Sequence, residues 1–259
     1  MFIIINPGRF GRYAMLLCLC LIAVSAGAYQ NSALSLFTPS ELAQSESEIS
    51  IMHRFYGAVD EEPLETFFGL DTGANISLSL RRNIKYSLEA KASYTKFQNR
   101  YALGCAWKPT TWDFPVHAQL DLEYFNFALA GIEERRSNFL YLLSVQNNIW
   151  DKYSILTINT GYDGYYQRMV YGLGLHLLAT EKITVLAEYY PDFDRKQHAN
   201  ENDFLGKYDA YAFGIKLDTY GHHFIFLLGN SSGMNPATQS LGTNNAKDLH
   251  FGFNLQRRI

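Results

Sequence analysis

The sequence predicts an all-β protein, an antiparallel transmembrane β-barrel of about 12 strands. From Glu48 to Ile259, apolar and polar residues alternate in repeated runs that are separated by turn residues. Many of these runs are nine to twelve residues long, close to the roughly 9–11 residues with which a tilted strand crosses a bilayer. Although 47% of the residues are hydrophobic, no stretch after the first 28 residues has the roughly 18 consecutive apolar residues of a spanning helix.

The first 28 residues have the features of a secretory signal peptide. Arg9 and Arg12 precede an apolar stretch at 13–24, and the small residues at 25–28 favour cleavage after Ala28. A retained anchor helix is the alternative, but the apolar stretch is shorter than the roughly 20 residues that a span needs. The next residues, 29–47, are polar, rich in serine and without periodicity, and they predict a flexible N-terminal segment.

The barrel is expected over residues 48–259, with a strand wherever the alternation runs between turn residues. In the run 168–178, for example, Met169 and Tyr171 share one face, while Gly172 and His176 share the other. The predicted strands are 48–55, 75–81, 86–95, 100–107, 116–127, 138–146, 153–161, 168–178, 183–190, 208–217, 222–230 and 248–257.

Two architectures produce such faces: a membrane barrel with its apolar face outward, and a soluble sandwich or barrel with that face inward. The long strands favour the membrane barrel, and so do the polar faces, which are rich in glycine and carry charges of both signs at mid-strand. The candidate lumen-lining residues are Arg54, Glu89, Lys91, Asp121, Glu123, His176 and Glu188.

The lengths of the connections agree with a barrel whose two termini lie in the periplasm. In such a barrel the even connections are short turns, whereas the odd ones can be long surface loops. The three longest connections, 56–74, 191–207 and 231–247, are all odd. Aromatic residues near strand ends, such as Trp107 and Tyr189, fit the girdles at the two membrane interfaces.

Four stretches carry a resemblance to a known family: His53-Arg54-Phe55, residues 67–76 (FFGLDTGANI), residues 221–224 (GHHF) with 230–234 (NSSGM), and residues 250–254 (HFGFN). Through them the chain resembles a family of uncharacterised outer-membrane β-barrels of Gram-negative bacteria, a domain of unknown function. The resemblance implies a single barrel domain in the outer membrane and no activity. Outer-membrane lipid and the barrel-insertion machinery are the expected partners.

Two motifs invite a catalytic or metal-binding interpretation. Asp71-Thr72-Gly73-Ala74 looks like the motif of retroviral-type aspartic proteases, but that chemistry needs two carboxylates and the motif occurs once. We interpret it as a turn in which Gly73 adopts a positive φ. His222 and His223 are adjacent on a strand and point to opposite faces, so they cannot share one ion. A zinc or copper site formed by lumen histidines remains an alternative, whereas hydrogen-bonded histidines, no metal, no cofactor and no catalytic residue are expected.

The sequence leaves several functions open. The favoured one is a narrow pore or transporter for small solutes, and the alternatives are a plugged structural barrel or a lipid-modifying outer-membrane enzyme. The enzyme would need a Ser, a His and a carboxylate converging at one rim. A soluble periplasmic binding barrel is the least favoured. The formal net charge of −3, without a basic stripe, predicts no nucleic-acid partner.

Overall fold

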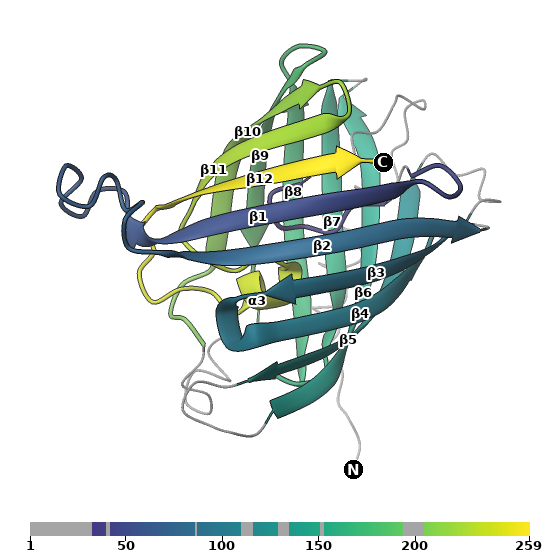
Figure 1. The fold of residues 1–259 in the computed structure, drawn as a ribbon, viewed down its shortest axis with the longest axis horizontal. Coiled ribbons are helices and arrows are strands. Elements are labelled where there is room, and N and C mark those ends of the chain that lie inside the picture. Colours follow the sequence, from purple (N-terminus) through teal and green to yellow (C-terminus); the bar gives the residue numbers. More distant parts are fainter. Residues whose placement is uncertain are drawn as a thin grey trace, which may run out of the picture.

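Twelve antiparallel strands form a closed barrel in which each strand pairs with its neighbours in sequence and β1 pairs with β12 (Figure 1). This is a computed structural model, and it describes residues 33–39, 42–85, 87–109, 116–128, 135–150, 153–193 and 205–259. The predicted signal peptide lies outside the described residues. The prediction of an all-β antiparallel barrel is confirmed.

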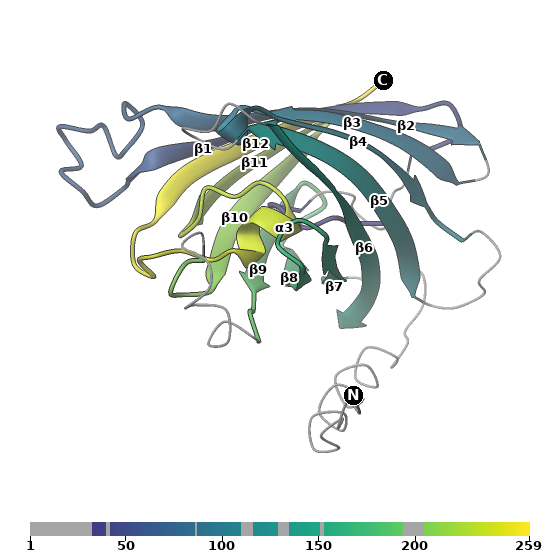
Figure 2. The same ribbon diagram turned by 90° about the horizontal axis from the view of Figure 1, so that it is seen from below.

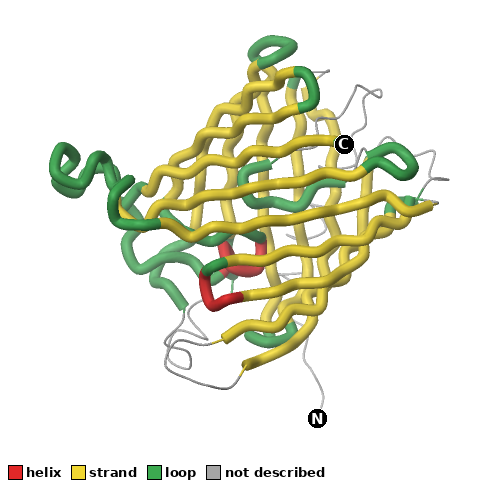
Figure 3. The backbone as a smooth tube through the Cα atoms, viewed as in Figure 1, coloured by secondary structure: helices red, strands yellow, loops and turns green. Residues whose placement is uncertain are grey.

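Every predicted strand has a counterpart, and most bounds agree within a few residues. The largest difference is at β6, which extends the predicted run 138–146 at both ends. The strands are β1 (Ser47–Ala58), β2 (Ala74–Lys85), β3 (Leu88–Thr95), β4 (Arg100–Trp107), β5 (His117–Ala128), β6 (Arg135–Trp150), β7 (Ser154–Asp163), β8 (Arg168–Leu178), β9 (Ile183–Tyr190), β10 (Ala210–Thr219), β11 (His222–Gly229) and β12 (His250–Arg258). Strands dominate the described chain (Figure 3). The short 3-10 turn η1 (Phe97–Asn99) joins β3 to β4.

The alternation in sequence becomes an inner and an outer face. On β5, Gln119, Asp121 and Glu123 are buried inside the barrel, whereas Leu120 and Leu122 on the other face are exposed. Exposed apolar residues recur on the outer face of most strands. A barrel that buries its charges and exposes its apolar side chains is suited to lipid and not to water. Among the described residues no helix is long and apolar enough to cross a membrane.

The two ends of the barrel differ. One end, here called the turn end, carries Ser47 at the start of β1 and Ile259 after β12, whose backbones exchange two hydrogen bonds of 2.9 Å. The opposite end, here called the loop end, carries the odd connections. The β1–β2 connection is the one that projects furthest from the barrel in Figure 1.

Two segments fold into the barrel (Figure 2). From the loop end, the β11–β12 connection brings helix α3 (Pro236–Ser240) inside, where Ala237 packs into a buried apolar cluster. Asn235 caps this helix by accepting the backbone N–H of Thr238 at 2.9 Å. The wall contributes the rest of the cluster from inner positions of β4, β5, β6 and β8: Ala102, Phe125, Phe127, Leu140, Leu142 and Val170. The inner face is therefore partly apolar, whereas the sequence predicted small and polar residues there.

The second inward segment is Ala33–Thr38, which we call the lumenal segment. It lies within the barrel, in front of β7 and β8 and behind β1 in the view of Figure 1. All its residues except Phe37 are buried. It belongs to the region 29–47, for which the sequence predicted flexibility.

Candidate functional site: the filled lumen

Glu188 of β9 holds the lumenal segment by its backbone. Its carboxylate accepts the N–H groups of Leu34 at 2.6 Å, Ser35 at 2.9 Å and Leu36 at 3.4 Å. The hydroxyl of Tyr190 donates a further hydrogen bond to the same carboxylate. Because a buried carboxylate is costly unless it is well hydrogen-bonded, the segment and Glu188, which is 4% exposed, satisfy each other.

Arg54 of β1 and Asn254 of β12 hold the same segment from a part of the wall three to four strands away from Glu188. Arg54 Nη2 donates to the carbonyl oxygen of Leu34 at 2.7 Å, and Nη1 donates to Asn254 Oδ1 at 2.7 Å. Asn254 Nδ2 donates to the same carbonyl of Leu34 at 2.9 Å. The two predicted residues Arg54 and Glu188 are thus brought together through the backbone that lies between them.

Asn159 of β7 binds Phe37, near the C-terminal end of the segment, through its side-chain amide. The amide supplies a donor and an acceptor, as the backbone of a neighbouring strand would. Its Oδ1 accepts the N–H of Phe37 at 2.8 Å, and its Nδ2 donates to the carbonyl oxygen of Phe37 at 2.8 Å. Both backbone polar groups of Phe37 are satisfied in this way, so a segment without strand partners can be buried.

Glycines on the inner face make room for the segment. A Cβ at Gly172 or Gly174 of β8 would lie 2.4 Å or 2.5 Å from a methyl carbon of Leu36, and a Cβ at Gly214 of β10 would lie 2.9 Å from Leu34. Side chains at these three positions would meet the segment. The small residues of the inner face are therefore part of the fit between wall and segment.

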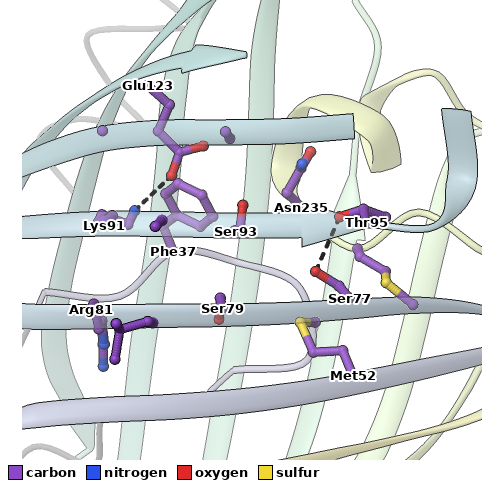
Figure 4. A pocket seen from close by; sticks show the side chains of 15 residues that line it. Phe37, Met52, Ser77, Ser79, Arg81, Lys91, Ser93, Thr95, Glu123 and Asn235 are labelled. Atoms are coloured by element: carbon purple, nitrogen blue, oxygen red, sulfur yellow. Dashed lines mark hydrogen bonds and ion pairs between the residues drawn. The ribbon is translucent and has the colours of Figure 1, made fainter. Parts of the chain in front are cut away.

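A second charged cluster joins three further predicted residues. Lys91 Nζ of β3 lies 2.7 Å from Asp121 Oδ1 and 3.0 Å from Glu123 Oε1, both on β5. Gln119 Nε2 donates to both carboxylate oxygens of Asp121 at 3.1 Å. Lys91 Nζ also lies 3.8 Å from the ring centroid of Phe37, so this cluster contacts the lumenal segment (Figure 4).

We expect replacement of Lys91 by Met to destabilise the barrel, because it leaves the carboxylates of Asp121 and Glu123 buried without their cation. Breaking one side of a buried ion pair costs about 3–5 kcal/mol. Unfolding in urea, followed by the heat-modifiable gel mobility of the barrel, measures the change. Lys182→Met, at an exposed position of the β8–β9 turn, is the matched control. Equal midpoints for the two variants would contradict a stabilising cluster.

The other two predicted residues, Glu89 and His176, are inside the barrel but outside these clusters. Glu89 is 3% exposed on β3 and acts electrostatically on Arg81, whose Nε pairs with Glu48 Oε1 at 3.0 Å. His176 of β8 is 1% exposed, and neither ring nitrogen has a hydrogen-bond partner in the described part of the chain.

The motifs with catalytic or metal interpretations do not assemble a site among the described residues. Asp71 lies in an exposed turn, and Gly73 has a φ of 86° there, as predicted for a turn. No group of three or more His, Cys, Asp or Glu side chains could hold a metal ion within the described ranges. His223 hydrogen-bonds Asp218 near the turn end, and no serine of the described chain is bonded to that pair.

Beside the lumenal segment, three cavities follow one another along the inner face of β1–β4, and we call this series the wall passage. The first, of about 120 Å³, reaches Glu48 and Gln256 near the turn end. The second, of about 110 Å³, is drawn in Figure 4 and shares Met52, Ser79 and Lys91 with the first, among others. The third, of about 180 Å³, lies at the loop end and shares part of its lining with the second. The shared residues there are Thr95, Met234 and Asn235.

The fold and the filled lumen define a membrane barrel of the outer-membrane type. The family model described as "Membrane bound beta barrel domain (DUF5777)" matches residues 31–137 and 164–259. The chain belongs to this family, whose function is unknown, and the resemblance found in the sequence is confirmed. No curated protein matches the chain.

Among solved structures, the KdgM porin matches with a TM-score of 0.51 and 8% identity, covering 81% of this chain and 98% of that chain. The NanC porin has a TM-score of 0.46 and 7% identity, covering 80% and 97%. Omp33, an outer membrane protein of Acinetobacter baumannii, has a TM-score of 0.47 and 12% identity, covering 83% and 99%. At such low identity, the likeness to the KdgM porin shows the barrel fold alone.

Proposed function

We propose that the protein is an outer-membrane pore for small hydrophilic solutes, in which the lumenal segment narrows the lumen to the wall passage. The observation that supports this function is the series of adjoining cavities between the turn end and the loop end. Its lining is mixed: Phe37, Met52 and Met234 lie beside hydroxyls and charged groups. The polar part consists of Ser77, Ser79, Ser93, Thr95, Arg81, Lys91 and Glu123. The hydroxyls and charged groups in this lining can replace part of the water around a hydrophilic solute, which a wholly apolar constriction could not do.

The proposed pore also has an expected location and orientation in the outer membrane. Removal of residues 1–28 on export would leave the lumenal segment close to the new N-terminus. With the turn end toward the periplasm, the long connections face outward. Fractionation with outer membranes, and not with the soluble periplasm, is the expected result for this location.

A thiol placed in the wall passage tests the pore. We expect a charged, membrane-impermeant thiol reagent to lower the conductance of Ser79→Cys in planar bilayers, because Ser79 lines both of the first two cavities. Leu78→Cys is the matched control, because Leu78 is the neighbour of Ser79 on β2 and its side chain is exposed on the outer face. Both variants need Cys105→Ala, because Cys105 is free and exposed.

The same recordings separate the pore from the plugged structural barrel. That second candidate is favoured by the apolar cluster that α3 makes with β5, β6 and β8. Folded wild-type barrels that carry no current, together with Ser79→Cys barrels that carry none before or after labelling, would contradict the pore and support the plugged barrel.

A further inference from the structure

We infer that Arg100 is the centre of a binding site for a small solute carrying an oxyanion, a carboxylate or a phosphate, at the loop end of the lumen. This inference deepens the proposed function by naming the class of solute, and it rests on that function for its biological role. It stands on the environment of one guanidinium and on the cavity beside it.

Arg100 is buried without an anionic partner. It is the first residue of β4, is 7% exposed, and stacks its guanidinium carbon 4.1 Å from the ring centroid of Phe125. Its Nη2 is enclosed and has no hydrogen-bond acceptor among the described residues. No carboxylate of the described chain forms an ion pair with it, whereas in the same lumen Arg81 pairs with one carboxylate and Lys91 with two.

Two carboxylates act electrostatically on Arg100, but the contacts that hold them are with other groups. The two carboxylates are Glu123 and Asp163. Glu123 pairs with Lys91 at 3.0 Å, and Asp163 Oδ1 accepts the backbone N–H groups of Tyr165 and Tyr166. Asp163 Oδ2 has no hydrogen-bond partner among the described residues and forms no ion pair with Arg100. Because burying a charge is costly unless it is paired and hydrogen-bonded, the enclosed guanidinium favours an anion from outside the chain.

The cavity beside Arg100 offers space and neutral polar partners for such a solute. Its volume of about 180 Å³ is the largest of the three in the wall passage. Its polar lining comes from β2, η1 and the β11–β12 connection, including Asn75, Gln98, Ser232 and Asn235. None of the residues that line it carries a negative charge. A guanidinium with surrounding amides and hydroxyls suits a hydroxylated carboxylate, because the former binds the charge and the latter bind the hydroxyl groups.

The position of the cavity gives the site its role in the pore. It is the cavity at the loop end, and it opens toward the second cavity at Thr95, Met234 and Asn235. A solute entering from the loop end meets Arg100 before it meets the charges of Lys91 and Glu123. The site would therefore favour entry of anionic solutes over neutral ones of the same size.

Equilibrium binding to the full-length protein in detergent tests the site, with gluconate as the probe and sorbitol as its neutral counterpart of equal chain length. We expect saturable gluconate binding, at least tenfold weaker sorbitol binding, and at least a tenfold rise of the gluconate Kd in Arg100→Gln. Arg257→Gln, at an exposed position of β12, is the matched control and should bind like the wild type. Competition by inorganic phosphate would show that any oxyanion is accepted, and its absence would assign the site to carboxylates.

Two results would overturn the site: equal binding of gluconate and sorbitol by the wild type, or an unchanged gluconate Kd in folded Arg100→Gln. If Arg100→Gln does not fold, Arg100→Lys is tested in its place, because lysine keeps the positive charge but lacks the paired N–H donors of the guanidinium. An unchanged gluconate Kd in Arg100→Lys, together with equal binding of sorbitol, would also refute the site. Binding does not need conduction, so gluconate binding to a silent barrel would contradict only the pore. Conduction without Arg100-dependent binding would contradict only the site.

Discussion

Deleting residues 33–38 is expected to raise the single-channel conductance several-fold over that of the wild type. The deletion removes the chain that Glu188, Asn159 and Arg54 of the wall hold inside the lumen. Solutes would then no longer be confined to the wall passage. The apolar cluster around α3 remains, so we expect a wider pore and not a fully open barrel. Recordings in planar bilayers measure the change.

The control for this deletion removes six residues elsewhere. Residues 61–66 lie in the β1–β2 connection, which projects outside the barrel (Figure 1), and their deletion should leave the conductance unchanged. A deletion of 33–38 that yields folded barrels with wild-type conductance would contradict a role of the lumenal segment in narrowing the pore.

The second large effect is expected for Glu188→Gln. A neutral amide at this position presents one oxygen where two charged oxygens accept the N–H groups of Leu34, Ser35 and Leu36. Hydrogen bonds to charged groups contribute about 1.5–3 kcal/mol each, and a loss of about 1.4 kcal/mol corresponds to a tenfold change in an opening equilibrium. We therefore expect amide hydrogen exchange at residues 34–36 to accelerate by at least tenfold.

Hydrogen exchange read by mass spectrometry on the peptides covering 33–38 checks this expectation. Glu181→Gln, at an exposed position of the β8–β9 turn, should leave the exchange of these peptides unchanged. Equal exchange in Glu188→Gln and the wild type would show that the carboxylate does not hold the segment. Conductance of the same variant should move toward that of the deletion, since the released segment spends part of its time outside the lumen.

The strands were predictable because their signal is local. Lipid outside and polar groups inside impose a period of two on each strand, and this period can be read without knowing the partners of the strand. The same alternation predicted that Lys91, Asp121 and Glu123 lie on the inner face. What it could not give is which inner residues meet, because that depends on register and on what else enters the barrel.

The lumenal segment was not predictable from local pattern. Its partners are distant in sequence, with Glu188 separated from Leu34 by 154 positions and Asn159 from Phe37 by 122. Because the segment is held by side chains and not by pairing with a strand, its sequence shows no alternation of apolar and polar residues. Two signals were present: the inner glycines of β8, and the continuous apolar run from Phe139 to Leu143, which indicates a strand with apolar surroundings on both faces, lipid outside and an apolar cluster inside.

Cross-linking of the lumenal segment within membranes tests most directly whether it fills the barrel. Ser35 Oγ lies 3.3 Å from Gln239 Nε2 of α3. We expect a short bifunctional thiol reagent to join Ser35→Cys to Gln239→Cys efficiently in intact membranes, with Cys105 replaced by Ala. Leu64→Cys in the projecting β1–β2 connection, 88% exposed, should not join to Ser35→Cys. Failure of the Gln239 pair, or equal cross-linking of both pairs, would contradict a segment held inside the lumen.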